Sequence, residues 1–180
     1  YFHNKLMETA SLKDIREMQS KRLRATVKHV YESNAAYRRL FEQAAVMPDD
    51  IRTAEDIVKL PMTNKDILRE SYPLGLSCVP RRDIVEMHMS SGSTGTPVIM
   101  PYSAADLAQW AECMARCYRM AGGLPGDGVQ ITPLFGLFNG GFGMYHGARA
   151  AGLFVIPAGP GNTQRQVRLA RDLKTRILTG

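Results

Sequence analysis

The residues best suited to chemistry form one short run of small polar side chains between two apolar runs, 84–89 and 98–100. The members of this run are Ser90, Ser91, Gly92, Ser93, Thr94, Gly95 and Thr96. Glycine accepts positive φ and lets backbone N–H groups approach a ligand closely, and hydroxyl side chains add further donors. Successive N–H groups in such a turn form a concavity that binds anions. The run predicts a loop that binds polyphosphate, with an ordinary solvated loop as the alternative.

The spacing of this loop excludes a Walker A motif, which needs Gly, four residues, then Gly-Lys-Ser/Thr at the start of a helix. Gly92 and Gly95 are only three positions apart, no lysine follows them, and the chain continues into a strand-like run. A phosphate bound here would therefore be held by loop amides and hydroxyls rather than by a helix N-terminus.

A second candidate segment, 133–143, interleaves aromatic residues with glycines after a strand-like run. Aromatic faces supply contact area and glycines leave room, so the segment suits a flat apolar ligand. Close packing of a helix on a sheet is the equally weighted alternative. Aromatics interleaved with glycines make a poor helix start, and the stretch 144–151 is expected to complete a helix. The candidate ligand-binding residues are Phe135, Gly136, Phe138, Gly140 and Gly141.

Two histidines and two cysteines are the remaining candidates. His88 precedes the polar loop and His146 follows the glycines, but Gly92 to Gly95 fails the Gly-x-Ser-x-Gly spacing of a hydrolase elbow by one residue. We expect both histidines to be structural or to line a pocket. Cys113 and Cys117 lie one helical turn apart without a second pair of ligands nearby, so burial is expected rather than a metal site.

Composition places the chain among ordinary globular proteins. It has 180 residues, of which 44% are hydrophobic and 22% charged, and no run reaches the roughly 18 uncharged apolar residues of a membrane helix. The N-terminus lacks the apolar core of a secretion signal. Three cysteines without a disulfide spacing predict a reducing, cytoplasmic setting. The lack of a long apolar run leads us to expect no membrane association.

The net charge of +6 raises the question of nucleic-acid binding. The excess lies on amphipathic stretches, where basic residues usually form a solvated helix face. No aromatic-and-basic RNA motif or zinc-finger spacing accompanies it. The pattern therefore favours an anionic small-molecule substrate over nucleic acid.

The first part of the chain, 1–82, reads as a helical lead-in. Ser11, with Asp14 three residues on, predicts the start of a helix that runs to about residue 33, followed by a second helix over 36–45. Thr53 and the pair Thr63-Asn64 predict the starts of two short helices.

The second part, 83–180, alternates strands and helices and predicts an α/β fold with a mixed or parallel sheet. Ser103 predicts the start of a long helix whose buried stripe comprises Leu107, Trp110, Met114, Cys117, Tyr118 and Ala121. Strands are expected at 129–132, 153–157 and 176–179. Thr163 is expected to cap a basic helix between the last two.

Taken in order, these segments resemble the phenylacetate–coenzyme A ligase branch of the adenylate-forming (acyl-CoA synthetase) superfamily. The polar loop, Ser-Ser-Gly-Ser-Thr-Gly-x-Pro, is similar to the superfamily's phosphate-binding loop. The branch is indicated by segments that cover nearly the whole chain, namely 30–34, 37–41, 60–69, 72–76, 136–141 and 161–166.

The resemblance implies the N-terminal part of the large domain of an adenylate-forming enzyme. It implies that an aryl carboxylate reacts with Mg-ATP to give an acyl-adenylate, and that coenzyme A then displaces AMP. In that scheme residues 90–96 bind the ATP phosphates, and Phe135 to Gly141 contact the aryl acid. One departure is that Thr96 and Val98 stand where the family commonly has a lysine.

The resemblance also implies that catalytic and metal-binding residues lie in a part of the family that this chain does not match. We therefore expect an N-terminal portion of a ligase that is inactive alone, with an apolar face that could support homo-oligomers. Two alternatives stay open. One is a relative that transfers AMP to a deazaflavin coenzyme, and the other is a non-catalytic protein that binds a nucleotide or a partner.

Overall fold

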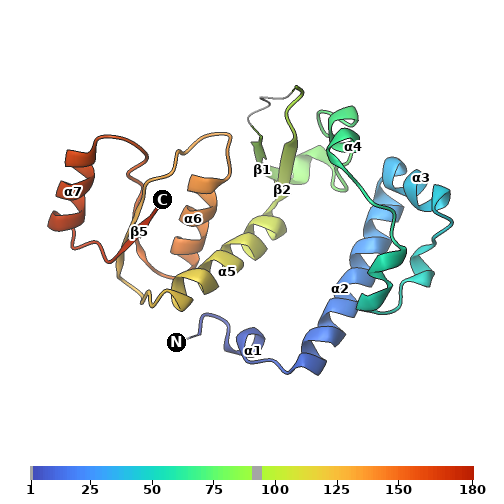
Figure 1. The fold of residues 1–180 in the computed structure, drawn as a ribbon, viewed down its shortest axis with the longest axis horizontal. Coiled ribbons are helices and arrows are strands. Elements are labelled where there is room, and N and C mark those ends of the chain that lie inside the picture. The colour runs from blue at the N-terminus through green and yellow to red at the C-terminus, as the bar shows by residue number, and fades with distance from the viewer. Residues whose placement is uncertain (1, 91–94) are drawn as a thin grey trace. The chain divides into compact units, whose positions relative to one another are not determined.

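The computed structural model describes residues 2–90 and 95–180 (Figure 1). The described residues form two compact units. We call the first the helical unit, built mainly from 6–84 with 95–101, and the second the α/β unit, built mainly from 102–180 with 2–5 and 85–90. The sequence-based boundary at residue 83 remains a prediction about domains.

The chain up to residue 83 is helical, as predicted. Its elements are α1 (Lys5–Glu8), α2 (Leu12–Ser33), α3 (Ala35–Gln43), η1 (Pro48–Asp50), η2 (Ala54–Lys59), α4 (Lys65–Glu70) and η3 (Arg81–Asp83), where η marks a 3-10 helix. The predicted starts at Ser11, Thr53 and Asn64 are confirmed, because each of these residues occupies the N-cap position of a helix. The core of the helical unit comprises Val27, Phe41, Val46 and Ile51.

The rest of the chain carries the strands. Its elements are β1 (Ile84–Met89), β2 (Ile99–Ser103), α5 (Ala104–Met120), β3 (Gly128–Ile131), α6 (Gly140–Ala150), β4 (Phe154–Ile156), α7 (Thr163–Asp172) and β5 (Ile177–Thr179). Strands β1 and β2 form a two-stranded sheet.

The larger sheet of the α/β unit has the order β4-β3-β5, and both pairs of strands are parallel. Val129 on the central strand is opposite Val155 on one side and Ile177 on the other. Parallel strands need crossover connections, and here α6 connects β3 to β4 while α7 connects β4 to β5. The predicted α/β fold with a parallel sheet is confirmed.

Helix α6 packs against α5 and against strands β3 and β4 (Figure 1). The core at this contact includes Ala115 and Tyr118 of α5 and Ala148 of α6, all buried. The helix expected over 144–151 is present as the later part of α6, and the expectation that the preceding aromatic and glycine residues make a poor helix start is wrong, since α6 begins at Gly140. The close contact between the helices needs glycine at Gly143 and Gly147, because a larger residue at either position would collide with α5.

Two local expectations are also corrected. Asn162, not Thr163, caps α7, because its side chain accepts a hydrogen bond from the Arg165 N–H. Cys113 and Cys117 are exposed rather than buried. The reason is that α5 turns Ala115 and Tyr118 toward α6, which leaves both cysteines outside this contact.

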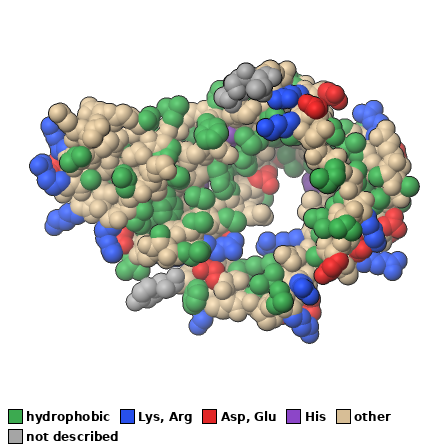
Figure 2. All heavy atoms as spheres, viewed as in Figure 1, with side chains coloured by type: hydrophobic (Ala, Val, Ile, Leu, Met, Phe, Trp, Pro, Cys, Tyr) green, Lys and Arg blue, Asp and Glu red, His purple; other side chains and the backbone are tan. Residues whose placement is uncertain are grey.

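No helix within residues 2–90 and 95–180 is both long enough and apolar enough to cross a bilayer. Figure 2 shows Lys and Arg side chains in several separate groups on the drawn face. This distribution fits the interpretation of the positive charge as solvated helix faces.

Candidate functional site

The predicted phosphate loop is described at Ser90, Gly95 and Thr96, whereas Ser91, Gly92, Ser93 and Thr94 lie outside the described residues. Gly95 has φ +129°, a conformation that L side chains rarely adopt. A Cβ atom placed there would have no neighbouring atom within 4 Å. Gly95 is therefore required by backbone conformation rather than by crowding.

The strand that enters this loop is tied to the second candidate segment. Strand β1 ends at Met89, whose backbone N–H donates to the carbonyl oxygen of Leu137 at 2.8 Å. Leu137 lies between the candidate residues Gly136 and Phe138. Two segments that are almost fifty positions apart in the chain therefore meet where the chain enters the predicted phosphate loop.

The candidate ligand-binding residues of this segment differ in their surroundings. Phe135 is half-buried, with its ring centroid 5.4 Å from that of Phe142, whereas Phe138 is 62% exposed. A Cβ at Gly136 would meet nothing nearer than 3.9 Å, and at Gly140 nothing nearer than 3.6 Å. A Cβ at Gly141 would lie 2.7 Å from the Leu134 carbonyl oxygen, so this glycine serves close packing. The role of all five in binding an acid stays a prediction.

Next to this junction, one carboxylate bridges two histidines. Glu86 Oε1 lies 2.7 Å from His88 Nε2, and Glu86 Oε2 lies 3.1 Å from His146 Nε2. The other ring nitrogen of His88, Nδ1, lies 3.3 Å from the Leu137 carbonyl oxygen. We call Glu86, His88 and His146 the histidine–glutamate cluster.

Aromatic side chains enclose His88, which is only 1% exposed. The rings of Tyr102, Trp110 and Phe142 have centroids 5.6–5.7 Å from the centroid of the imidazole. Tyr102 also stacks on Trp110 at 5.2 Å. We call these three residues the aromatic shell, and they hold the imidazole in one orientation by packing on several sides.

The electrostatics of the cluster favour an ionised Glu86. Partial burial acts to raise the pKa of this carboxyl, but hydrogen bonds from His88 and His146 and their positive charge outweigh it, so the pKa is lowered. An ionised carboxylate only accepts hydrogen bonds, so both histidine Nε2 atoms that face it must carry a proton.

The sequence analysis singled out both histidines but missed Glu86. The missed signal was the period of two in a strand, which places Glu86 and His88 on the same face of β1. The hydrogen bond between Glu86 and His146 gave no such signal, because it joins β1 to a helix residue sixty positions away in the chain.

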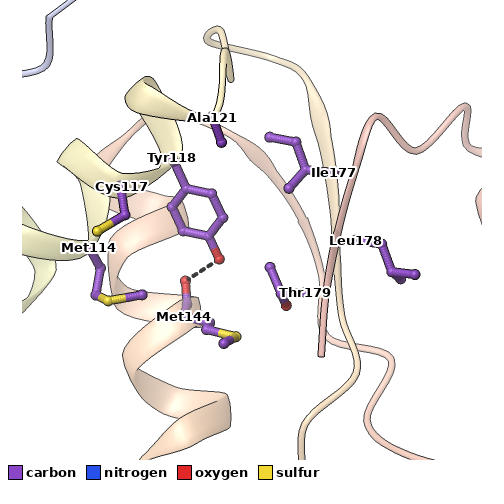
Figure 3. Close-up of a pocket in the computed structure, with 8 residues that line it drawn as sticks. All are labelled: Met114, Cys117, Tyr118, Ala121, Met144, Ile177, Leu178 and Thr179. Atoms are coloured by element: carbon purple, nitrogen blue, oxygen red, sulfur yellow. Dashed lines mark hydrogen bonds between the residues drawn. The ribbon is translucent and has the colours of Figure 1, made fainter.

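The α/β unit also has a pocket of about 240 Å³, whose lining includes none of the predicted site residues (Figure 3). Its lining comprises Met114, Cys117, Tyr118, Ala121, Met144, Ile177, Leu178 and Thr179. Burial raises the pKa of Tyr118 to about 12, and its hydroxyl donates to the Met144 carbonyl oxygen at 3.1 Å. The lining is mainly apolar.

The described residues do not provide a metal site. Among residues 2–90 and 95–180, no three His, Cys, Asp or Glu side chains are placed to hold a metal ion together. A set of three protein ligands for the magnesium ion that the family resemblance implies is therefore not gathered among the described residues.

Comparison with known proteins gives related enzymes over nearly the whole chain. The chain is 42% identical over 172 residues to the phenylacetate–coenzyme A ligase of Pseudomonas putida, covering 96% of this chain and 39% of the relative. It is 42% identical over 168 residues to the enzyme of the same name from Escherichia coli (strain K12), covering 93% of this chain and 38% of that enzyme. No protein-family model matches the chain.

The fold has solved counterparts. A crystal structure of 2-hydroxyisobutyryl-CoA ligase, in an open conformation with 2-HIB-AMP and CoA, matches with a TM-score of 0.87 and 28% identity. The match covers 96% of this chain and 41% of that structure. Over nearly its whole length the chain is therefore related to the phenylacetate–coenzyme A ligases of the adenylate-forming superfamily, and it corresponds to about two fifths of such a protein.

Proposed function

We propose that the protein containing this chain activates an aryl carboxylic acid, of which phenylacetate is the first candidate, to its coenzyme A thioester. A carboxylate oxygen of the acid attacks the α-phosphorus of ATP, and the bond to the β-phosphate breaks to release pyrophosphate. The sulfur of coenzyme A then attacks the acyl carbon, AMP leaves, and the thiol proton passes to solvent.

In the first step negative charge builds on the leaving pyrophosphate. Donors that already point at this charge lower the barrier, because they need not reorganise during the reaction. The loop 90–96 would supply such donors from backbone N–H groups and hydroxyls. The segment Phe135 to Gly141 would hold the aryl group.

The observation that carries this proposal is the backbone hydrogen bond from Met89 to Leu137, 2.8 Å long. Adenylation needs the acid beside the triphosphate, within about 3–3.5 Å at the reacting atoms. The hydrogen bond joins the strand that enters the ATP loop to the segment assigned to the acid. The resemblance to the ligase family also assigns the loop 90–96 to ATP and the segment Phe135 to Gly141 to the acid independently of this hydrogen bond.

The cellular location, the metal, the partners and the oligomeric state of the protein belong to the same proposal. We place the protein in the cytoplasm, with magnesium bound by residues outside the described part and with small molecules rather than nucleic acid as partners. Association into homo-oligomers is a further expectation. The chain spans about 39% of the length of the curated ligases, so these statements concern the whole protein.

Gly95→Ala in the complete protein tests the proposal. Because φ at Gly95 is +129°, an alanine there is strained by about 1–3 kcal/mol and would shift the loop. We expect acid-dependent pyrophosphate release to fall at least about tenfold, with a raised KM for ATP. The measurement is pyrophosphate release with phenylacetate and ATP.

The matched control is Gly126→Ala. Gly126 also has positive φ, +86°, and open space around a Cβ, but it lies in a turn outside the predicted site. Equal losses in both variants would show that backbone strain alone reduces activity and would contradict an ATP role for the loop.

Coenzyme A-dependent release of AMP separates the ligase from a deazaflavin adenylyltransferase. A complete protein without acid-dependent pyrophosphate release would favour the non-catalytic alternative.

A further inference from the structure

The histidine–glutamate cluster lies where the two substrate segments meet, and neither predicted segment includes it. We propose that Glu86, His88 and His146 form a positioning network in which doubly protonated His88 holds the Leu137 carbonyl, and with it the acid-binding segment, against the strand that enters the ATP loop. This inference rests on the proposed function for its effect on activity. Its structural part, the connection between His88 and Leu137, is tested separately below.

The hydrogen-bond partners of His88 determine which form of the ring fits. Nε2 faces the Glu86 carboxylate at 2.7 Å and Nδ1 faces the Leu137 carbonyl oxygen at 3.3 Å. Both partners are acceptors only, so both bonds form only when both ring nitrogens carry protons. A neutral His88 with its proton on Nε2 would leave two acceptors facing each other at Nδ1.

The surroundings suit an imidazolium ion. Glu86 supplies the compensating negative charge, and a buried charge requires such a partner. The rings of the aromatic shell lie 5.6–5.7 Å from the His88 centroid, two of them in T-shaped contacts with the imidazole and one tilted. His146 donates to the same carboxylate and so fixes its orientation.

The groups that surround His88 come from several elements. Glu86 lies on its own strand β1 and faces Nε2, Tyr102 lies on β2, and Trp110 lies on α5. His146 on α6 reaches the same carboxylate.

Two substitutions separate the two bonds of the ring. Asn places an amide N–H near the position of Nδ1, whereas Gln places one near Nε2. His88→Asn should therefore retain the bond to Leu137 and lose the one to Glu86, and His88→Gln should do the reverse. A side chain that only filled space would respond similarly to both changes.

The experiment measures pyrophosphate release by the complete protein with phenylacetate and ATP. We expect His88→Gln to raise the KM for phenylacetate about tenfold, the effect of one charge-assisted hydrogen bond, with little change in the KM for ATP. His88→Asn, which keeps the bond to Leu137, should leave the KM for phenylacetate close to that of the wild type. Equal effects of the two variants would overturn the proposal.

Hydrogen–deuterium exchange of the same proteins provides a readout that does not need activity. His88→Gln should speed exchange at the Met89 amide and in residues 136–139, and His88→Asn should not; unchanged exchange in both variants would overturn the connection. Should the buried site reject both substitutions, Glu86→Gln, at a side chain 23% exposed, tests the same network and should also speed exchange there. His29→Gln, an exposed histidine on α2, is the control. A protein that passes the exchange test but releases no pyrophosphate would contradict the proposed function alone.

Discussion

Asn34 shows how much one buried polar side chain can decide in the helical unit. Its Oδ1 accepts from the N–H groups of Ala36 and Tyr37 and so caps α3. Its Nδ2 donates to the carbonyl oxygens of Gly75 at 2.9 Å and Ser77 at 3.0 Å. The side chain therefore ties the segment after α4 to the junction of α2 and α3.

Asn34→Ala should lower the free energy of unfolding by about 2–4 kcal/mol, because it removes a helix cap and also the side-chain donor to the Gly75 and Ser77 carbonyl groups. Urea denaturation followed by circular dichroism measures the change. The matched control is Asn64→Ala, because Asn64 is an exposed cap that bonds only to the Asp66 and Ile67 N–H groups. We expect about 1 kcal/mol there, and equal losses at both sites would contradict the bridging role of Asn34.

His88 also shows how the hydrogen-bond partners of a single buried side chain decide its role. A lone histidine in a strand is most often structural, and the sequence supported no more than that. Its two acceptors, Glu86 and the Leu137 carbonyl, turn it into a group whose protonation state matters.

At the scale of the elements, the contact between α5 and α6 depends on small residues. A Cβ at Gly147 would lie 2.2 Å from Met114 Cβ, and one at Gly143 would lie 2.2 Å from Trp110 Cζ2. No real contact is that short, so a larger residue at either position must move the helices apart. Trp110 belongs to the aromatic shell, so such a movement would also reach the histidine–glutamate cluster.

Gly147→Ala should destabilise the α/β unit by about 1–3 kcal/mol or more through overpacking. Met114→Ala should not relieve it, because the clash is with the Cβ and backbone that alanine keeps. Thermal unfolding of the single and double variants measures this. Gly140→Ala is the control, since its Cβ would make only ordinary contacts at 3.6 Å or more. A stable Gly147→Ala variant would show that α5 and α6 can separate at low cost.

At the scale of the whole molecule, carboxylates in both units make stability depend on pH. Hydrogen bonds from Leu124 N–H and Arg176 hold the pKa of Asp127 below its usual range, despite a smaller opposing effect of burial. The hydrogen bond from Lys59, with backbone N–H groups of Thr53 and Arg52, does the same for Asp56. A lowered folded-state pKa adds stability above the unfolded pKa of about 3.9, and this stability is lost as pH falls through the folded pKa.

We therefore expect the Tm to fall as pH drops from about 4 toward 2. Asp127→Asn and Asp56→Asn should each lower the Tm at pH 7 and flatten this dependence, whereas the exposed Asp49→Asn should change neither. Differential scanning calorimetry across this pH range provides the measurement. A dependence that keeps its slope in both variants would assign acid unfolding to other carboxylates.

The sequence by itself determined most of the longer elements of this protein. Local signals sufficed because capping and periodicity act over only a few residues, as the caps at Ser11, Asn64 and Ser103 illustrate. The order of these elements also indicated the ligase resemblance, and the comparisons confirmed the relation. The assignment of individual residues to ATP and to the acid remains a prediction.

Only the tertiary structure decided which residues meet. Gln130 lies fully buried in an apolar strand, and its sequence context does not explain why a polar side chain stands there. The structure explains it, because the side-chain amide of Gln130 donates a hydrogen bond to Gln166 of α7. Glu86 and His146 are brought together in the same way, from sixty positions apart. Such contacts depend on how helices and strands pack, and packing follows from the combined shape of several elements rather than from any local pattern.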